Sequence, residues 1–319
     1  MRGLARRRVL LGIVVLLALA GVAILAEGLR EEERPRAPEL SAGRPLAVPA
    51  RALGSARSLI ATDGDLPQDD APVWVFDRPA RGRRAVRQLA VQGDRVVVAE
   101  RTSVRADAGE PEGTRYAVGR WTGGTNVAFR IVPRSRGLDV RVVTLDGRSR
   151  QLSRGTAPAA RVQGADRELA VATWQPGKLP ALFVVDHGQA RERVSVAIFS
   201  GESAFRTRVA TFKLPVRGLP RRDWSLAIAR GIGNRPNLVA VARAGSSRHP
   251  EVHVVSGDAD FQRFVAQYAI GLPPLGRAAV ALPGAALGRP AVYLLDRDRR
   301  ELRVVEYAAS PLAAIEPPR

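Results

Sequence analysis

Residues 177–186 read GKLPALFVVD, and this stretch recurs twice, as GNRPNLVAVA at 233–242 and as GRPAVYLLD at 288–296. Each copy is a turn containing Gly and Pro followed by a short run of Val, Leu and Ala. This is the pattern of a buried β-strand entered from a tight turn. Successive copies lie about 55 residues apart, and a fixed period of this length predicts a repeat architecture.

A second marker keeps the same period. SGESAF at 200–205 recurs as SGDADF at 256–261, and Leu214-Pro215 recurs as Leu272-Pro273. Two independent markers in phase are harder to obtain by chance than one.

The repeat extends towards the N-terminus. WTGG at 121–124 resembles WQPG at 174–177, and TLDG at 144–147 falls where the Ser-Gly turn is expected. APVWVFD at 71–77 resembles the strand at 289–296. The pattern therefore predicts five units, which begin near residues 72, 127, 180, 236 and 290.

Each unit has room for four short strands. In the unit after Pro180 we expect strands at 181–185, 194–199, 208–213 and 224–229. A sheet of four antiparallel strands repeated radially is a propeller blade, whose two apolar faces are covered by its neighbours. We therefore expect an all-β fold, a β-propeller of about five four-stranded blades over residues 59–310, with the ring closed by strands from both chain ends.

The N-terminus predicts a membrane segment. Residues 9–26 are apolar and uncharged, and as a helix they span about 27 Å, close to the hydrocarbon thickness of a bilayer. The basic tail at 1–8 contains Arg2, Arg6, Arg7 and Arg8, which predicts a cytoplasmic N-terminus and an extracytoplasmic C-terminal domain. The alternative is a signal peptide cleaved near Ala18-Leu19-Ala20, which would leave a secreted protein.

Two segments flank the expected propeller. Residues 27–58 are rich in Pro, Arg and Glu and show no sustained period, which favours a flexible linker. Residues 311–319 form a C-terminal tail.

The repeats carry a family resemblance. The motif G-x-x-P-x-L-x-V-x-D, with EVHVVSG at 251–257 followed by Phe261-Gln262, resembles the FG-GAP or VCBS repeats of exported bacterial proteins. The same repeat type builds the propeller of integrin α chains. The resemblance covers residues 165–310, and residues 60–165 more loosely. It implies an extracytoplasmic propeller used for binding or adhesion.

The chain departs from that family at the calcium loop. The family's loop before the motif carries aspartates that bind Ca²⁺, whereas 173–176, 229–232 and 282–287 contain no carboxylate. Only Asp63, Asp65, Asp69 and Asp70 could form such a loop, and Pro67 takes a ligand position among them. We expect a solvated acidic turn there, and neither a metal nor a cofactor.

Catalytic motifs are absent from the sequence. His187, His249 and His253 show no paired-ligand spacing, and no nucleophile elbow or phosphate-binding loop occurs. Ser246-Ser247 near His249 is interpreted as part of a connecting loop.

Two further pairs match between units. Asp186 matches Asp296, and we expect these carboxylates to cap turns or pair with Arg rather than act as acid and base. Trp121 matches Trp174, and we expect both to pack between blades.

The composition limits the partners. The net charge is +19, but lysine occurs only at Lys178 and Lys213, so nearly all of the 50 basic residues are arginine, scattered along the chain. Without basic clusters interleaved with aromatic residues, nucleic acid is not an expected partner. Weak attraction to anionic surface polymers or lipid headgroups fits better. The absence of cysteine excludes disulfides and thiolate chemistry.

These patterns favour a membrane-anchored binding or adhesion module for a protein or a cell-wall glycan, without catalysis. One alternative is a propeller enzyme such as a glycan lyase or hydrolase, which would need clustered acids or histidines. Another is a structural subunit of a cell-envelope complex.

Overall fold

A computed structural model of the chain describes one compact body within residues 38–319. The described residues are 39–40, 43–54, 59–62, 73–106, 110–111, 113–158, 167–186, 193–217, 224–229, 237–242, 251–272, 278–281, 291–296 and 299–306. The predicted membrane segment at 9–26, the basic tail and the C-terminal tail lie outside them. Within the described ranges, no helix has the length and apolarity needed to cross a bilayer.

The described strands form five sheets, which confirms the all-β prediction. Four of the sheets are antiparallel and four-stranded. The fifth has four antiparallel strands and, at its edge, the additional short strand β1 (Glu39–Leu40). We call the sheets blades 1 to 5, in chain order. Blade 1 contains β3 (Leu59–Thr62), β4 (Val73–Phe76), β5 (Arg83–Gln92) and β6 (Arg95–Arg105). Blade 2 contains β7 (Arg115–Arg120), β8 (Asn126–Arg134), β9 (Gly137–Thr144) and β10 (Gln151–Ala157). Blade 3 contains β11 (Arg167–Ala172), β12 (Ala181–Asp186), β13 (Arg193–Phe199) and β14 (Arg208–Arg217). Blade 4 contains β15 (Trp224–Ala229), β16 (Asn237–Ala242), β17 (Glu251–Val255) and β18 (Phe264–Ile270). Blade 5 contains β19 (Ala278–Ala281), β20 (Ala291–Asp296), β21 (Glu301–Glu306) and β2 (Leu46–Ala47).

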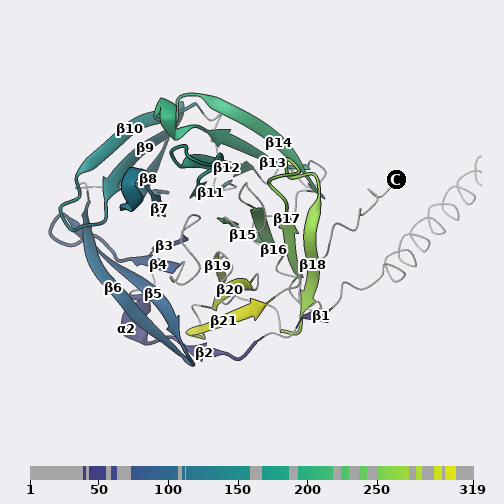
Figure 1. The fold of residues 1–319 in the computed structure, drawn as a ribbon. Helices are drawn as coiled ribbons and strands as arrows, with labels where there is room; N and C mark the ends of the chain where they lie inside the picture. Colours follow the sequence, from purple (N-terminus) through teal and green to yellow (C-terminus); the bar gives the residue numbers. More distant parts are fainter. Residues whose placement is uncertain are drawn as a thin grey trace, which may run out of the picture. The chain divides into compact units, whose positions relative to one another are not determined.

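The first strand of each blade lines the centre of a ring. β3 contacts β7, β7 contacts β11, β11 contacts β15, β15 contacts β19, and β19 returns to β3 (Figure 1). Five sheets whose innermost strands close a circle form a five-bladed β-propeller.

The predicted repeat matches the second strand of every blade. The five units expected near residues 72, 127, 180, 236 and 290 correspond to β4, β8, β12, β16 and β20. The phase differs by one strand, because 224–229, expected as the fourth strand of its unit, is β15, the innermost strand of the next blade. The Gly-Pro turn that marks the repeat lies between the first and second strands of a blade, whereas the blade begins at its inner strand.

The N-terminal segment closes the ring. β2 pairs antiparallel with β21 as the outer strand of blade 5, and β1 pairs parallel with β18 of blade 4. Ring closure by strands from both chain ends is as predicted, but β1, β2 and α2 lie within the segment 27–58, which is predicted as a flexible linker. Both strands are two residues long, too short to show a sequence period.

Burial explains why this segment is ordered against the blades. Leu46, Val48 and the short helix α2 (Ala50–Leu53) enter the core between blades 5 and 1. The Val48 N–H donates to Arg300 O at 2.8 Å, and Arg303 Nη1 donates to Gly43 O at 3.1 Å.

In blades 2, 3 and 4 the turn before the outer strand rests on the preceding blade. Phe205 and Phe261 end the two matching Ser-Gly turns, each with positive φ and each donating its N–H to the turn serine's carbonyl at 2.8 Å. Both rings are fully buried, Phe205 in the core with blade 2 and Phe261 in the core of blade 3. Leu145 of the TLDG turn enters the core of blade 1.

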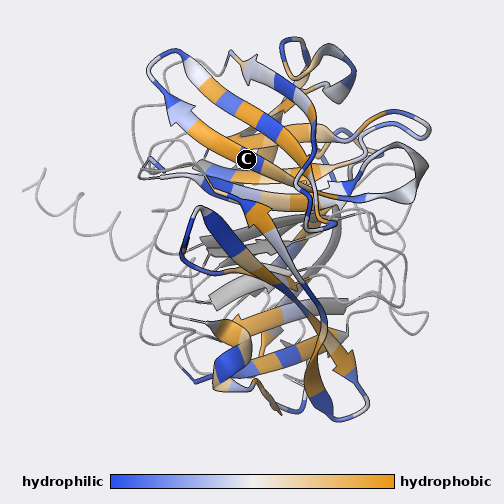
Figure 2. Ribbon diagram, turned by 90° about the vertical axis from the view of Figure 1, so that its left-hand side faces the viewer, coloured by the Kyte–Doolittle hydropathy of each residue, from blue (hydrophilic) through white to orange (hydrophobic). Residues whose placement is uncertain are grey.

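The expected packing of the two tryptophans is confirmed. Trp174 contacts Phe183 of its own blade and Phe261 of the next. Trp121 packs against the core shared by blades 2 and 3. Consecutive residues are buried along strands such as β4 and β12, as expected for sheets whose two faces both pack on neighbours. Hydrophobic residues (orange) run along the strands and are interrupted by hydrophilic ones (blue) (Figure 2).

Candidate functional site

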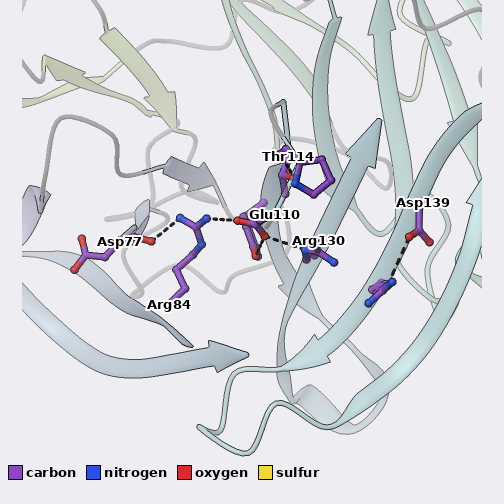
Figure 3. A network of polar contacts seen from close by, with 9 residues as sticks. Asp77, Arg84, Glu110, Thr114, Arg130 and Asp139 are labelled. Atoms are coloured by element: carbon purple, nitrogen blue, oxygen red, sulfur yellow. Dashed lines mark hydrogen bonds and ion pairs between the residues drawn. The ribbon is translucent and has the colours of Figure 1, made fainter. Parts of the chain in front are cut away.

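Glu110 is the centre of a buried polar cluster between blades 1 and 2. Its Oε1 accepts hydrogen bonds from Tyr116 Oη at 2.6 Å and Arg130 Nε at 2.9 Å, and its Oε2 pairs with Arg84 Nη2. The side chains of Glu110, Arg84 and Arg130 are all less than a tenth exposed. Both carboxylate oxygens are therefore bound by side chains of the surrounding strands (Figure 3).

Three strands and one connection position the cluster. Arg84 lies at the start of β5, Tyr116 on β7 and Arg130 on β8. Glu110 lies in the connection from β6 to β7, where Thr114 Oγ1 donates to Pro111 O at 2.7 Å. Arg84 Nη1 also donates to Asp77 O at the end of β4, so the cluster ties the second strand of blade 1 to blade 2.

The surroundings fix the protonation states. Burial opposes ionisation of Glu110, but hydrogen bonds from Tyr116, Arg130 and Arg84 hold the pKa of its carboxyl below the ordinary value of 4.5. Burial, together with the Glu110 hydrogen bond and charge, raises the pKa of the Tyr116 phenol above 10. Glu110 is therefore a carboxylate at neutral pH, and Tyr116 remains a neutral donor.

The remainder of the cluster is packed. Arg84 lies over the Tyr116 ring, with its Cζ 5.2 Å from the centroid, and Phe76 stacks on the same ring at 4.6 Å. A carboxylate with both oxygens occupied in such a site acts as a fixed acceptor and is a poor proton donor. The arrangement joins two blades.

Other acids of the described residues are also paired with arginine. Asp77 pairs with Arg87, and Asp139 lies 3.4 Å from Arg154 Nε and 3.6 Å from Arg141 Nε. Figure 3 shows Asp139 beside the Glu110 cluster, with a contact of its carboxylate drawn as a dashed line. Among the described residues, no group of three or more His, Asp or Glu could hold a metal ion.

The residues singled out from the sequence have mixed outcomes. Asp296 caps a turn and pairs with arginine, as predicted, because it accepts from the Arg299 N–H at 3.1 Å and lies 3.6 Å from Arg299 Nη1. Asp186 is the last residue of β12, as Asp296 is of β20, and it is half-buried. His253 is buried on β17, opposite Ala240 and Gln267, which confirms the interpretation as a packed strand residue.

Several candidates lie outside the described residues. They are Asp63, Asp65, Asp69, Asp70, His187, Ser246, Ser247 and His249.

The Glu110 cluster was missed by sequence reasoning. Its members lie outside the repeated motif and far apart in the chain, and no spacing links them. The available signal was Arg130, which lies between Phe129 and Ile131 in an otherwise apolar stretch of β8, where a buried arginine requires a carboxylate partner.

Comparisons with known proteins do not assign a family. No family model matches the chain, and no curated protein does. Among solved structures, the chain is similar to the catalytic domain of a Coprinopsis cinerea GH62 α-L-arabinofuranosidase. That match has 10% identity, a TM-score of 0.42, and coverage of 88% of this chain and 99% of the other.

Two bacterial structures show a similarly loose likeness. NanB sialidase from Streptococcus pneumoniae matches at 15% identity and a TM-score of 0.42, covering 70% of this chain and 34% of the sialidase. TolB from Acinetobacter baumannii matches at 12% identity and a TM-score of 0.34, covering 81% and 57%. The propeller assignment therefore rests on the sheet order and the ring of inner strands.

Proposed function

We propose that the chain is a membrane-anchored extracytoplasmic propeller that binds a protein or a cell-wall glycan and performs no catalysis. The observation that supports this most directly is the pairing of buried and half-buried acids with arginine. Glu110, Asp77, Asp139 and Asp296 each contact arginine and serve to join strands, blades or turns. The anchor and the FG-GAP or VCBS kinship remain parts of the proposal that rest on the sequence.

A glycan hydrolase would need a different arrangement. It requires two carboxyl groups on either side of the scissile bond, one of them protonated, with the separation between them set by the bond and the attacking water. Glu110 is held ionised by two arginines and a phenol, so it does not supply that acid. Ring scaffolds commonly bind ligands through their loops, because loops vary while the sheets stay constant.

A capture experiment tests the proposal. The full-length chain with a C-terminal tag is extracted from membranes in mild detergent after cross-linking, and co-purified protein and glycan are identified. Excess untagged chain added before cross-linking is the control, and it should abolish specific capture. Release of new reducing ends from wall glycans by the purified chain would contradict the non-catalytic assignment.

A further inference from the structure

Exposed arginines from three chain segments meet at the outer edge of blades 1 and 2. The turn before β10 lies against the end of β6, because the Arg105 N–H donates to Ser149 Oγ at 2.9 Å and Thr102 Oγ1 donates to Leu145 O at 2.8 Å. Arg83 Nη2 also donates to Gly147 O. We call the exposed arginines of these segments the arginine corner: Arg81, Arg83, Arg101, Arg105, Arg148 and Arg150.

The corner places like charges directly opposite each other. Arg83 on β5 is the register partner of Arg105 on β6, so both side chains leave the same face of the sheet. Opposed like charges are destabilising in a sheet. The side-chain hydrogen bonds of Arg83 go to Ser103 Oγ and Gly147 O, which are neutral acceptors and leave its charge uncompensated.

Other arginine rows in the same protein carry carboxylates. Arg130, Arg141 and Arg154 are aligned across β8, β9 and β10, and each of them pairs with a carboxylate, Glu110 or Asp139. Arg87, opposite Arg101, pairs with Asp77.

Among the described residues of the turn before β10, the acid is Asp146. Its Oδ1 accepts from Thr144 Oγ1 at 2.6 Å and from the Arg148 N–H at 2.9 Å. The described residues 81–83, 101–105 and 146–150 together contain six arginines and one acid, so the excess positive charge is local and is not only a property of an arginine-rich chain.

The spacing of the corner favours an extended ligand. Register partners lie about 5 Å apart, and Arg101 and Arg105 are four strand residues apart, about 13 Å. A single small anion cannot bridge that length. Guanidinium groups bind carboxylate or phosphate through paired hydrogen bonds, so a chain that repeats such groups would engage several arginines together.

The corner lacks the features of a lipid or nucleic-acid surface. Proteins that lie on a membrane surface insert apolar side chains into it, and proteins that bind single-stranded nucleic acid stack the bases on aromatic side chains. Among the described residues, the exposed large hydrophobic side chain is Val209, which lies on β14 of blade 3.

We propose that the arginine corner is the docking site for a linear anionic glycan polymer. This rests on the proposed function as a binding module and names its ligand class. The polymer lies along β6 and the start of β5 in blade 1, beside the turn before β10 of blade 2, with its anionic groups on Arg83, Arg101 and Arg105.

The test measures binding of the purified full-length chain in detergent to polygalacturonate oligomers by calorimetry. Arg101→Gln/Arg105→Gln is the test variant. The matched control is Arg206→Gln/Arg208→Gln, which removes the same charge from two exposed arginines outside the corner, at the start of β14 in blade 3. We expect the test variant to lose affinity at least about tenfold and the control less than about twofold. Methyl-esterified oligomers and monomeric galacturonate should bind neither variant nor the unmodified chain.

Three results would overturn the assignment. The first is an equal loss of affinity for polygalacturonate in the two variants, and the second is equal affinity of the unmodified chain for the methyl-esterified oligomers. The third is that the unmodified chain binds single-stranded DNA or anionic vesicles but not polygalacturonate. Failure here with a ligand recovered in the capture experiment would reject the corner and leave the binding-module function standing. Binding here with no captured ligand would support the corner alone. Unchanged melting temperatures in both variants exclude unfolding as the cause of lost affinity.

Discussion

Phe205 of blade 3 meets Phe129 of blade 2 edge to face, with ring centroids 6.1 Å apart and planes at 80°. Trp174 of blade 3 and Phe261 of blade 4 meet across the next boundary with centroids 5.7 Å apart. In both cases the turn before the outer strand of one blade delivers an aromatic ring to the blade before it. The recurring Ser-Gly-x-x-x-Phe marker is therefore a device for joining blades.

Replacing that ring should cost a large share of the stability. Phe261→Ala removes a fully buried ring between Trp174 and Phe212, and we expect a loss of about 3–5 kcal/mol in the free energy of unfolding. Val209→Ala, at a side chain 49% exposed, should change it by less than about 0.5 kcal/mol. Urea denaturation compares the two, and similar losses would mean that the ring does not hold the boundary.

Removing the central carboxylate should leave two buried arginines uncompensated. Glu110→Gln keeps the shape but not the charge, and we expect it to cost about 3–5 kcal/mol. The control is Glu301→Gln, whose pair with Arg303 is more exposed and is expected to contribute less than about 1 kcal/mol. Chemical denaturation at neutral pH measures both, and a neutral Glu110→Gln would contradict the role of the cluster.

The same cluster predicts an acid dependence. The pKa of Glu110 is lower in the folded chain than its ordinary 4.5, so its contribution is fully present above pH 4.5 and is lost as the pH falls through the folded value. The difference in stability between the unmodified chain and Glu110→Gln should therefore shrink as the pH is lowered below 4.5. Denaturation curves at a series of pH values measure this difference, and one that stays constant in acid would disprove the linkage.

The closing segment can be probed at one glycine. A Cβ on Gly43 would lie 2.2 Å from Val304 O, and Gly43 has a φ of +63°. Gly43→Ala should therefore loosen β2 and raise the rate of proteolysis within residues 39–53. Gly82→Ala is the matched control, since Gly82 has a φ of +72° with nothing within 4 Å of its Cβ position, so it should show only conformational strain of about 1 kcal/mol. Equal proteolysis of the two variants would show that β2 does not depend on this close approach.

Much of the fold was predictable because the repeat carries its own evidence. The Gly-Pro turn and the Ser-Gly turn fix local backbone geometry, and both recur with the strands they precede. The periodic signal located the second strand of all five blades. It could not locate the blade boundary, because a period has no intrinsic starting point.

The rest depended on contacts between distant residues. β1 and β2 are two residues long and form only because blades 4 and 5 supply partners at the other end of the chain. The Glu110 cluster likewise joins a connection to strands on two blades, and no spacing in the sequence links Glu110 to Arg84 or Arg130.

Closure by β2 also sets the order of assembly. Gly43 and Arg303, which bond to each other across the finished junction, are separated by 260 positions, so the first-made segment must wait for the last-made one. During synthesis, at about 5–20 residues per second, the early edge strands stay unsatisfied for tens of seconds. Until the β20–β21 hairpin has been synthesised, the ring of the nascent protein stays open, and the strand edges on both sides of the opening can pair with other chains.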